Sequence, residues 1–192
     1  MKIGIIGGGN MGAAIYSGIK KKYKVCVAEV DKKRAQSLKR KYKAVLKDIA
    51  PLVKQSDAVV VAVKPQGIDD VLEMIKENTV KSTLVISIAA GITISYLEKK
   101  LGKKARVIRT MPNLPAQIGE GITAIAKGRL ARADDVKTAD NIFSCVGETV
   151  VVKEDLIDAV TAVSGSGPAY VFHFVENLMK ASQALGLNKE LS

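Results

Sequence analysis

Short apolar runs recur along the first 111 residues, each bounded by glycine, proline or charged residues. Five of them have the length and the continuous hydrophobicity of parallel strands buried on both faces, at residues 3–6, 25–28, 58–63, 84–88 and 106–111. Between them, apolar residues recur at helical spacing near 11–20, 32–42, 48–55, 67–77 and 93–101. This alternation predicts an α/β fold with a doubly wound, mostly parallel sheet.

The pattern changes toward the C-terminus. Residues 121–126 and 148–152 have the pattern of two further strands, with a polar helix near 131–145 between them. A long helical pattern then runs from residue 154 to about 185, interrupted at 165–168 by Gly-Ser-Gly-Pro. Its apolar positions are too numerous for a solitary solvent-exposed helix: Val160, Val163, Tyr170, Phe174, Leu178, Ala181 and Leu185. We expect this segment to pack against another surface, such as a second subunit.

The first strand leads directly into a glycine-rich turn and then a helix. The residues of this turn are Ile6, Gly7, Gly8, Gly9, Asn10, Met11 and Gly12, with the spacing G-x-G-x-x-G. In such a turn Gly7 allows the sharp bend, Gly9 lets the backbone approach a pyrophosphate, and Gly12 lets the helix pack close to the strand. The helix N-terminus offers free N–H groups to the phosphates. We therefore predict a Rossmann-like dinucleotide-binding domain at residues 1–152; the alternative is a glycine-rich turn without a ligand.

Acidic and basic residues at the end of the second strand bear on the choice of cofactor. Glu29 lies about where a carboxylate hydrogen-bonds the adenosine ribose of NAD, and Asp31 is a competing candidate. The basic run Lys32-Lys33-Arg34 could instead hold the 2′-phosphate of NADP. We expect NAD(P)H with a preference for NADH, because a carboxylate is nearer to the ribose position than the lysines. The alternative is a strand-end carboxylate that faces water.

Three later segments follow predicted strands, where ligands bind in open α/β sheets. The first contains Ala62, Val63, Lys64 and Pro65. The second contains Ile88, Ala89 and Ala90, in a stretch of mostly small residues that lets a flat nicotinamide approach the backbone. The third places Asn113 between two prolines, in a stiff loop suited to face a substrate. Plain strand ends and a connecting loop are the alternatives.

Composition narrows the function classes. Residues 1–50 contain thirteen Lys or Arg and three Asp or Glu, so they carry most of the net charge of +11. With 4% aromatic residues and no nucleic-acid motif, we interpret this charge as a field for an anionic cofactor rather than a nucleic-acid surface. No apolar run reaches the ~18 residues of a membrane span, and the start lacks the features of a signal peptide. Cys26 and Cys145 have no metal-ligand spacing, and we expect reduced, buried thiols in a cytoplasmic protein without a metal site.

The motifs together resemble the pyrroline-5-carboxylate reductase family. The stretches at 6–12, 62–66, 87–91 and 109–113 occur in that family's order, and the most specific stretch is Glu-Asp-Leu-Ile-Asp-Ala-Val-Thr-Ala-Val-Ser-Gly-Ser-Gly-Pro-Ala-Tyr at 154–170. The resemblance implies reduction of 1-pyrroline-5-carboxylate to L-proline by hydride from NAD(P)H, the last step of proline biosynthesis. It also implies a homodimer or higher homo-oligomer formed through an all-α dimerisation domain, which begins here at 153–192. The residues near the substrate carboxylate would be Ser164, Gly165, Ser166 and Gly167.

The sequence departs from the family in two places. Lys47-Asp48-Ile49 stands where the family usually has an asparagine that contacts the adenosine, and the family continues through several more helices beyond residue 192. An NAD(P)H-binding fragment without full catalysis is therefore the alternative function. The related β-hydroxyacid dehydrogenases need a lysine where this chain has Val171. The single histidine, His173, lies in the apolar helical pattern and is not nominated, so no catalytic residue is predicted.

Overall fold

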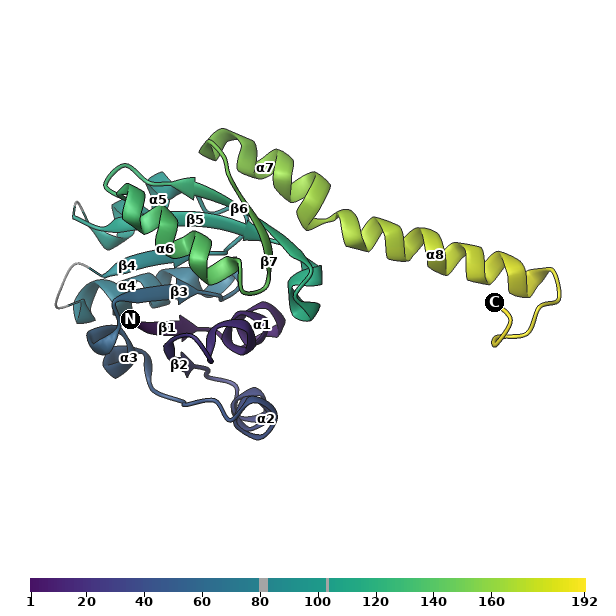
Figure 1. Cartoon of the computed structure of the whole chain (residues 1–192), viewed down its shortest axis with the longest axis horizontal. Coiled ribbons are helices and arrows are strands. Elements are labelled where there is room, and N and C mark those ends of the chain that lie inside the picture. The colour runs from purple at the N-terminus through teal and green to yellow at the C-terminus, as the bar shows by residue number, and fades with distance from the viewer. Residues whose placement is uncertain (80–82, 103) are drawn as a thin grey trace.

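The computed structural model describes residues 1–79, 83–102 and 104–192, and the described strands form one seven-stranded sheet (Figure 1). The strand order is β2-β1-β3-β4-β5-β6-β7. All neighbours run parallel except β5 and β6, which are antiparallel. The strands are β1 (Lys2–Ile6), β2 (Lys24–Ala28), β3 (Ala58–Val61), β4 (Leu84–Ser87), β5 (Arg106–Pro112), β6 (Gly121–Lys127) and β7 (Gly147–Val151). The mostly parallel, doubly wound sheet predicted from the sequence is confirmed.

Helices cover both faces of the sheet. They are α1 (Asn10–Ile19), α2 (Lys32–Tyr42), α3 (Ile49–Gln55), α4 (Ile68–Asn78), α5 (Ile94–Leu101) and α6 (Ala133–Phe143), with short 3-10 helices η1 (Pro65–Gly67) and η2 (Leu114–Ile118). One core cluster packs α1 and α6 on the sheet, and a second packs α3, α4 and α5 on the other face. Most fully buried apolar strand residues are divided between these two clusters, as expected for strands covered on both faces.

The register aligns the carboxyl ends of β1, β3 and β4 at one edge of the sheet, beside Arg109 in the middle of β5. Ile6 of β1 is opposite Val61 of β3, Val61 is opposite Ser87 of β4, and Ser87 is opposite Arg109 of β5. Two strands are shorter than predicted, since β3 ends at Val61 and β4 ends at Ser87. The predicted site residues that follow them therefore lie in the loops beyond the strands, where parallel sheets bind ligands.

The C-terminal segment leaves the sheet as a projecting helix (Figure 1). After β7 come η3 (Glu154–Leu156), α7 (Ile157–Val160), a π-helical turn η4 (Thr161–Gly165) and α8 (Gly167–Ala184). The helix thus changes phase at the π turn. The last residue of this turn, Gly165, is the first of the four residues at which the sequence predicted an interruption. No residue of α8 is buried, so its apolar side chains do not pack on the rest of this chain.

The two cysteines and the lengths of the helices were also predicted from the sequence. Cys26 and Cys145 are free thiols, as expected, but they are half-buried rather than buried. The pKa of the Cys26 thiol is raised, mainly because burial disfavours the thiolate. No helix in the described part of the chain has both the length and the apolar composition needed to cross a bilayer.

Candidate functional site

The glycine-rich turn has the geometry that its sequence predicts. Gly7 has φ of +101°, and a Cβ there would lie 2.4 Å from the carbonyl oxygen of Ala62. A Cβ on Gly12 would lie 2.0 Å from the carbonyl oxygen of Gly7, so only glycine lets α1 begin this close to the turn. Gly9 is the N-cap of α1, which has no side-chain cap bond and no acidic residue in its first turn. The first N–H groups of α1 are therefore available to an anion.

Glu29 holds the glycine-rich turn from the end of β2. Its carboxylate accepts the Gly8 N–H at Oε2 and the Asp31 N–H at Oε1, both at 2.8 Å, and its side chain is 4% exposed. Arg34 Nη1 lies 3.9 Å from Glu29 Oε2. Asp31 instead caps α2 by accepting the Arg34 N–H. Of the two carboxylates proposed from the sequence, Glu29 is the one that touches the turn, and each of its oxygens keeps capacity for a second hydrogen bond.

The segments after β3 and β4 lie beside the glycine-rich turn. The Ala62 N–H donates to the carbonyl of Ile6 at 2.7 Å, and the Ile88 N–H donates to the carbonyl of Val61 at 3.1 Å. Beyond these anchored positions the chain emerges at the surface: Lys64 and Pro65 are exposed, as is Ala90, whereas Ala89 is buried. The three predicted cofactor segments thus meet at one edge of the sheet.

Asn113 joins the end of β5 to the C-terminal segment. Its Nδ2 donates to Ser164 Oγ at 3.2 Å, and its Oδ1 accepts the Ile122 N–H at 2.9 Å. Gly165 lies against Met111, because a Cβ on Gly165 would be 2.7 Å from Met111 Cε. Ser166 caps α8 without a side-chain bond, and Gly167 begins that helix. The structure therefore brings the predicted substrate residues together, and η2, directly after Asn113, packs against α1.

An ion-pair cluster around a buried arginine, beside these residues, was not predicted as a unit. Arg109 on β5 is 3% exposed, with Nη1 3.2 Å from Glu154 Oε1 and Nη2 2.9 Å from Asp158 Oδ1. Glu154 Oε1 also accepts the Ile94 N–H at the start of α5, at 2.6 Å. The available sequence signal was one arginine inside an apolar strand, which requires a charged partner when it is buried.

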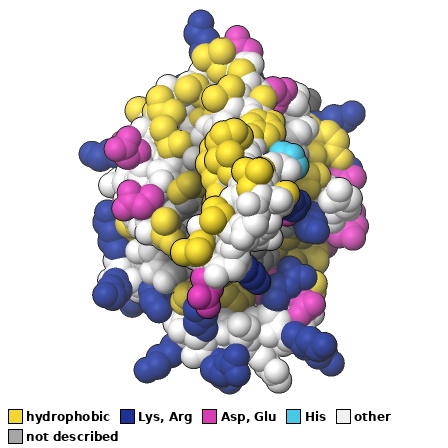
Figure 2. Space-filling view, turned by 90° about the vertical axis from the view of Figure 1, so that its right-hand side faces the viewer, with side chains coloured by type: hydrophobic (Ala, Val, Ile, Leu, Met, Phe, Trp, Pro, Cys, Tyr) yellow, Lys and Arg dark blue, Asp and Glu magenta, His cyan; other side chains and the backbone are white. Residues whose placement is uncertain are grey.

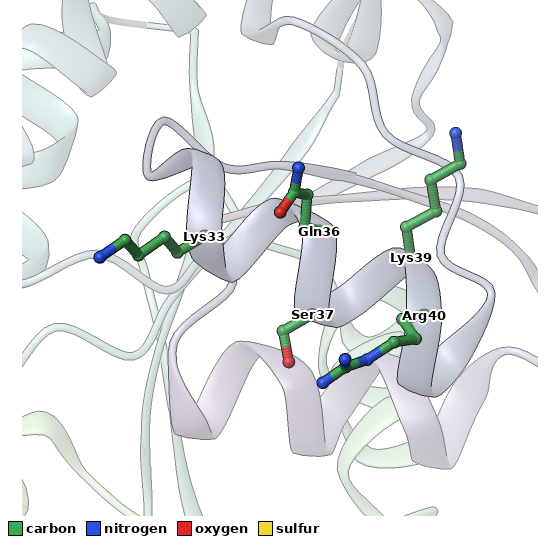
Figure 3. A pocket seen from close by; sticks show the side chains of 5 residues that line it. All are labelled: Lys33, Gln36, Ser37, Lys39 and Arg40. Carbon is green, nitrogen blue, oxygen red and sulfur yellow. The ribbon is translucent and has the colours of Figure 1, made fainter.

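Two further features are a hollow along α2 and the single histidine. A hollow of about 430 Å³ runs along α2, where Figure 3 shows Lys33 and Lys39 directed away from the pair Ser37 and Arg40; its lining also includes Gln36. His173 is exposed on α8, and its Nε2 lies 3.1 Å from Asn177 Nδ2. In the described ranges, no group of three or more histidine, cysteine, aspartate or glutamate residues is arranged to hold a metal ion.

Comparison with known proteins agrees with this geometry. The family model described as "NADP oxidoreductase coenzyme F420-dependent" matches residues 2–91, and "Pyrroline-5-carboxylate reductase dimerisation" matches residues 154–192. Pyrroline-5-carboxylate reductase from Mycobacterium tuberculosis is 38% identical over 100% of this chain and 68% of its own length. The protein of that name from Methanosarcina acetivorans is 40% identical over 98% of this chain and 72% of its length.

The structural comparison gives the same result. A solved structure of Plasmodium falciparum pyrroline carboxylate reductase, with NADP bound, superposes with a TM-score of 0.88 at 33% identity. That superposition covers 100% of this chain and 72% of the other chain. Together with the whole-chain identity to the curated relatives, it shows that this chain belongs to the pyrroline-5-carboxylate reductase family.

Proposed function

We propose that this protein reduces 1-pyrroline-5-carboxylate to L-proline with hydride from NAD(P)H, the last step of proline biosynthesis. Family membership supports this reaction. The observation that carries it in the structure is the meeting of a glycine-rich turn with the Asn113–Ser164 bridge at one edge of the sheet. The glycine-rich turn suits a dinucleotide, and the region around the Asn113–Ser164 bridge suits a small substrate.

The residues present fit a dinucleotide. The uncapped N-terminus of α1 and the glycine-rich turn, Ile6 to Gly12, would hold the pyrophosphate. Residues 62–65 and 88–90 would flank the ribose and the nicotinamide, since they form the loops that directly follow β3 and β4. When bound, the nicotinamide would supply the hydride to C5 of the cyclic imine, and a proton from solvent on the imine nitrogen completes the amine.

The contribution of this chain to the reaction is mainly positioning. The Ser164 hydroxyl, oriented by Asn113, and the Gly167 N–H at the start of α8 would hold the substrate carboxylate. Within the first turn of α8, Pro168 has no N–H and the Ala169 N–H donates to the Ser166 carbonyl at 2.9 Å, so Gly167 is the residue whose N–H would face the anion. Fixing the imine in this way lowers the barrier by orienting the reacting carbon.

NADH is the preferred cofactor in this proposal. The Glu29 carboxylate is already fixed beside the glycine-rich turn by two backbone N–H groups. It can accept the ribose hydroxyls, and its charge repels a 2′-phosphate at the same position. Arg34, 3.9 Å away, is the residue that would favour NADPH. The preference depends on the carboxylate being closer to the turn than any basic group.

The assembly in this proposal is a homodimer or higher homo-oligomer, with a dinucleotide-binding domain at 1–152 and a dimerisation region from 153. Large exposed apolar side chains on α8 support it, and Figure 2 shows hydrophobic side chains gathered at the end of the molecule that carries this helix. A monomeric protein rarely exposes such a continuous apolar surface.

A steady-state assay tests the reaction. The purified protein is mixed with NADH or NADPH and 1-pyrroline-5-carboxylate, and loss of the absorbance of the reduced nicotinamide is compared with the appearance of proline. We expect one proline for each cofactor oxidised. Cofactor binding without imine-dependent oxidation would reject the proposed reaction and favour a binding role.

A further inference from the structure

Three alternate residues, two on β5 and one just beyond its end, contact the segment 154–165. Arg109 pairs with Glu154 and Asp158, Met111 lies against Gly165, and Asn113 bonds Ser164. Side chains two residues apart on a strand share a face, so these contacts form a continuous row. The row ends at the residues to which the proposed function assigns the substrate carboxylate.

The segment held by this row changes helical phase within one turn. The Ser166 N–H donates to the carbonyl of Thr161 at 2.9 Å, which is the wider spacing of a π turn. The Thr161 hydroxyl also donates to the carbonyl of Ile157 at 2.7 Å. Such a turn is rare and is often found at functional sites, because it redirects side chains within a helix. Its position depends on what anchors the helix on either side.

Arg109 is the anchor on the N-terminal side. Its guanidinium is buried, and it binds carboxylates from both η3 and α7. Glu154 also fixes the start of α5 through the Ile94 N–H, so the cluster connects β5, η3, α7 and α5. Apolar contacts support the same docking, since Ile157 packs with Ile94, Ala124 and Ala126.

We propose that Arg109 is a positioning residue for the substrate: by clamping Glu154 and Asp158 it sets the π turn so that Ser164 meets Asn113 at the substrate carboxylate. Arg109 does not touch the substrate in this proposal and acts through Ser164. The inference rests on the proposed function, because it assigns the substrate carboxylate to that serine.

The test compares substrate and cofactor constants in matched variants. Arg109→Met removes both ion pairs. Arg109→Lys keeps the charge but loses the planar guanidinium that reaches two carboxylates at once. Arg106→Met is the control, because Arg106 pairs with Asp135 at the opposite end of the same strand. Asp158→Ala weakens the clamp from the exposed side, so it tests the proposal if Arg109→Met does not fold.

We expect Arg109→Met to raise the KM for 1-pyrroline-5-carboxylate by about tenfold and to leave the KM for NADH within about twofold. Arg109→Lys should recover part of the loss, and Asp158→Ala should raise the same KM to a smaller extent. Arg106→Met should leave both constants near wild type. Equal changes in the two KM values, or a loss of kcat alone, would overturn the proposal.

Hydrogen exchange provides a readout that does not need turnover. In Arg109→Met and Asp158→Ala, amides at 157–167 should exchange faster while those of β1 and β3 remain protected. Faster exchange throughout the sheet would mean that Arg109 only stabilises the fold. If the wild-type protein does not turn over the imine, the proposed function fails, and the exchange experiment still decides whether Arg109 fixes the π turn.

Discussion

At the residue scale, Glu29 combines two roles that the sequence suggested only in part. It is a strand-end carboxylate near the expected ribose, and it also accepts the N–H of Gly8, which fixes the shape of the turn. A substitution must therefore separate charge from hydrogen bonding. Glu29→Gln removes the charge and keeps the side-chain size and one acceptor oxygen, so one of the two backbone hydrogen bonds is retained.

We expect Glu29→Gln to shift the ratio of kcat/KM values toward NADPH by about five- to thirtyfold, since removing a nearby like charge is worth roughly 1–2 kcal/mol at a partly solvated site. Steady-state kinetics with both cofactors measures the ratio. Glu73→Gln is the matched control: it removes the charge of an exposed carboxylate on α4, so its ratio should stay near wild type. An unchanged ratio in Glu29→Gln would show that another group selects the cofactor.

Gly12 lies where a side chain would collide with the backbone of the glycine-rich turn. Gly12→Ala places a Cβ 2.0 Å from the backbone oxygen of Gly7, so α1 or the turn must move. We expect a loss of about 1–3 kcal/mol in the free energy of unfolding and weaker NADH binding. Denaturant unfolding and NADH fluorescence measure the two effects. In the control Gly67→Ala the new Cβ meets open space, and both values should change little; equal effects in the two variants would contradict the steric argument.

At the scale of elements, an ion-pair cluster links α4 to α5. Tyr96 donates its hydroxyl hydrogen bond to Asp69, and Lys100 Nζ lies 3.0 Å from the same carboxylate. These hydrogen bonds hold the pKa of Asp69 below its ordinary value, and the bond to Asp69 raises the pKa of Tyr96. The stabilisation from the lowered carboxyl pKa is present above the ordinary aspartate pKa and is lost as the pH falls through the lowered value.

Tyr96→Phe should therefore raise the pKa of Asp69 toward its ordinary value, because the first cause of the shift is removed. An NMR titration of the Asp69 carboxyl carbon measures this change directly. Tyr23→Phe is the control, since Tyr23 lies outside this cluster. An Asp69 titration that is the same in Tyr96→Phe and wild type would show that Lys100 alone holds the carboxylate.

The elements themselves followed from hydrophobic spacing, whereas the contacts between distant segments did not. Strands such as 3–6 were predictable because burial on both faces requires continuous apolar residues. The π turn was not, since its phase depends on how Arg109 and Asn113 hold residues far along the chain. Glu29 was predictable as a candidate through its spacing from the glycine-rich turn, but its bonds to two backbone N–H groups required the folded arrangement.

At the scale of the whole molecule, the exposed face of α8 is the feature that one chain does not explain. Tyr170, Phe174, Leu178 and Leu185 recur at helical spacing, and each is more than half exposed. Leaving such a stripe in water is unfavourable by about 1.5–3 kcal/mol for each large side chain relative to burial. A second copy that covers the stripe recovers this free energy, and in a symmetric pair each side chain contributes twice.

Phe174→Glu should therefore weaken self-association by roughly two orders of magnitude in the dissociation constant, because both copies lose a buried ring and gain a charge. Light scattering during size-exclusion chromatography measures the mass as protein concentration falls. Gln183→Glu introduces the same charge nine residues away, on the opposite side of the helix, and should leave the assembly intact. If both variants dissociate alike, added charge rather than loss of the stripe separates the subunits. If neither does, the stripe of α8 is not the surface through which the copies meet.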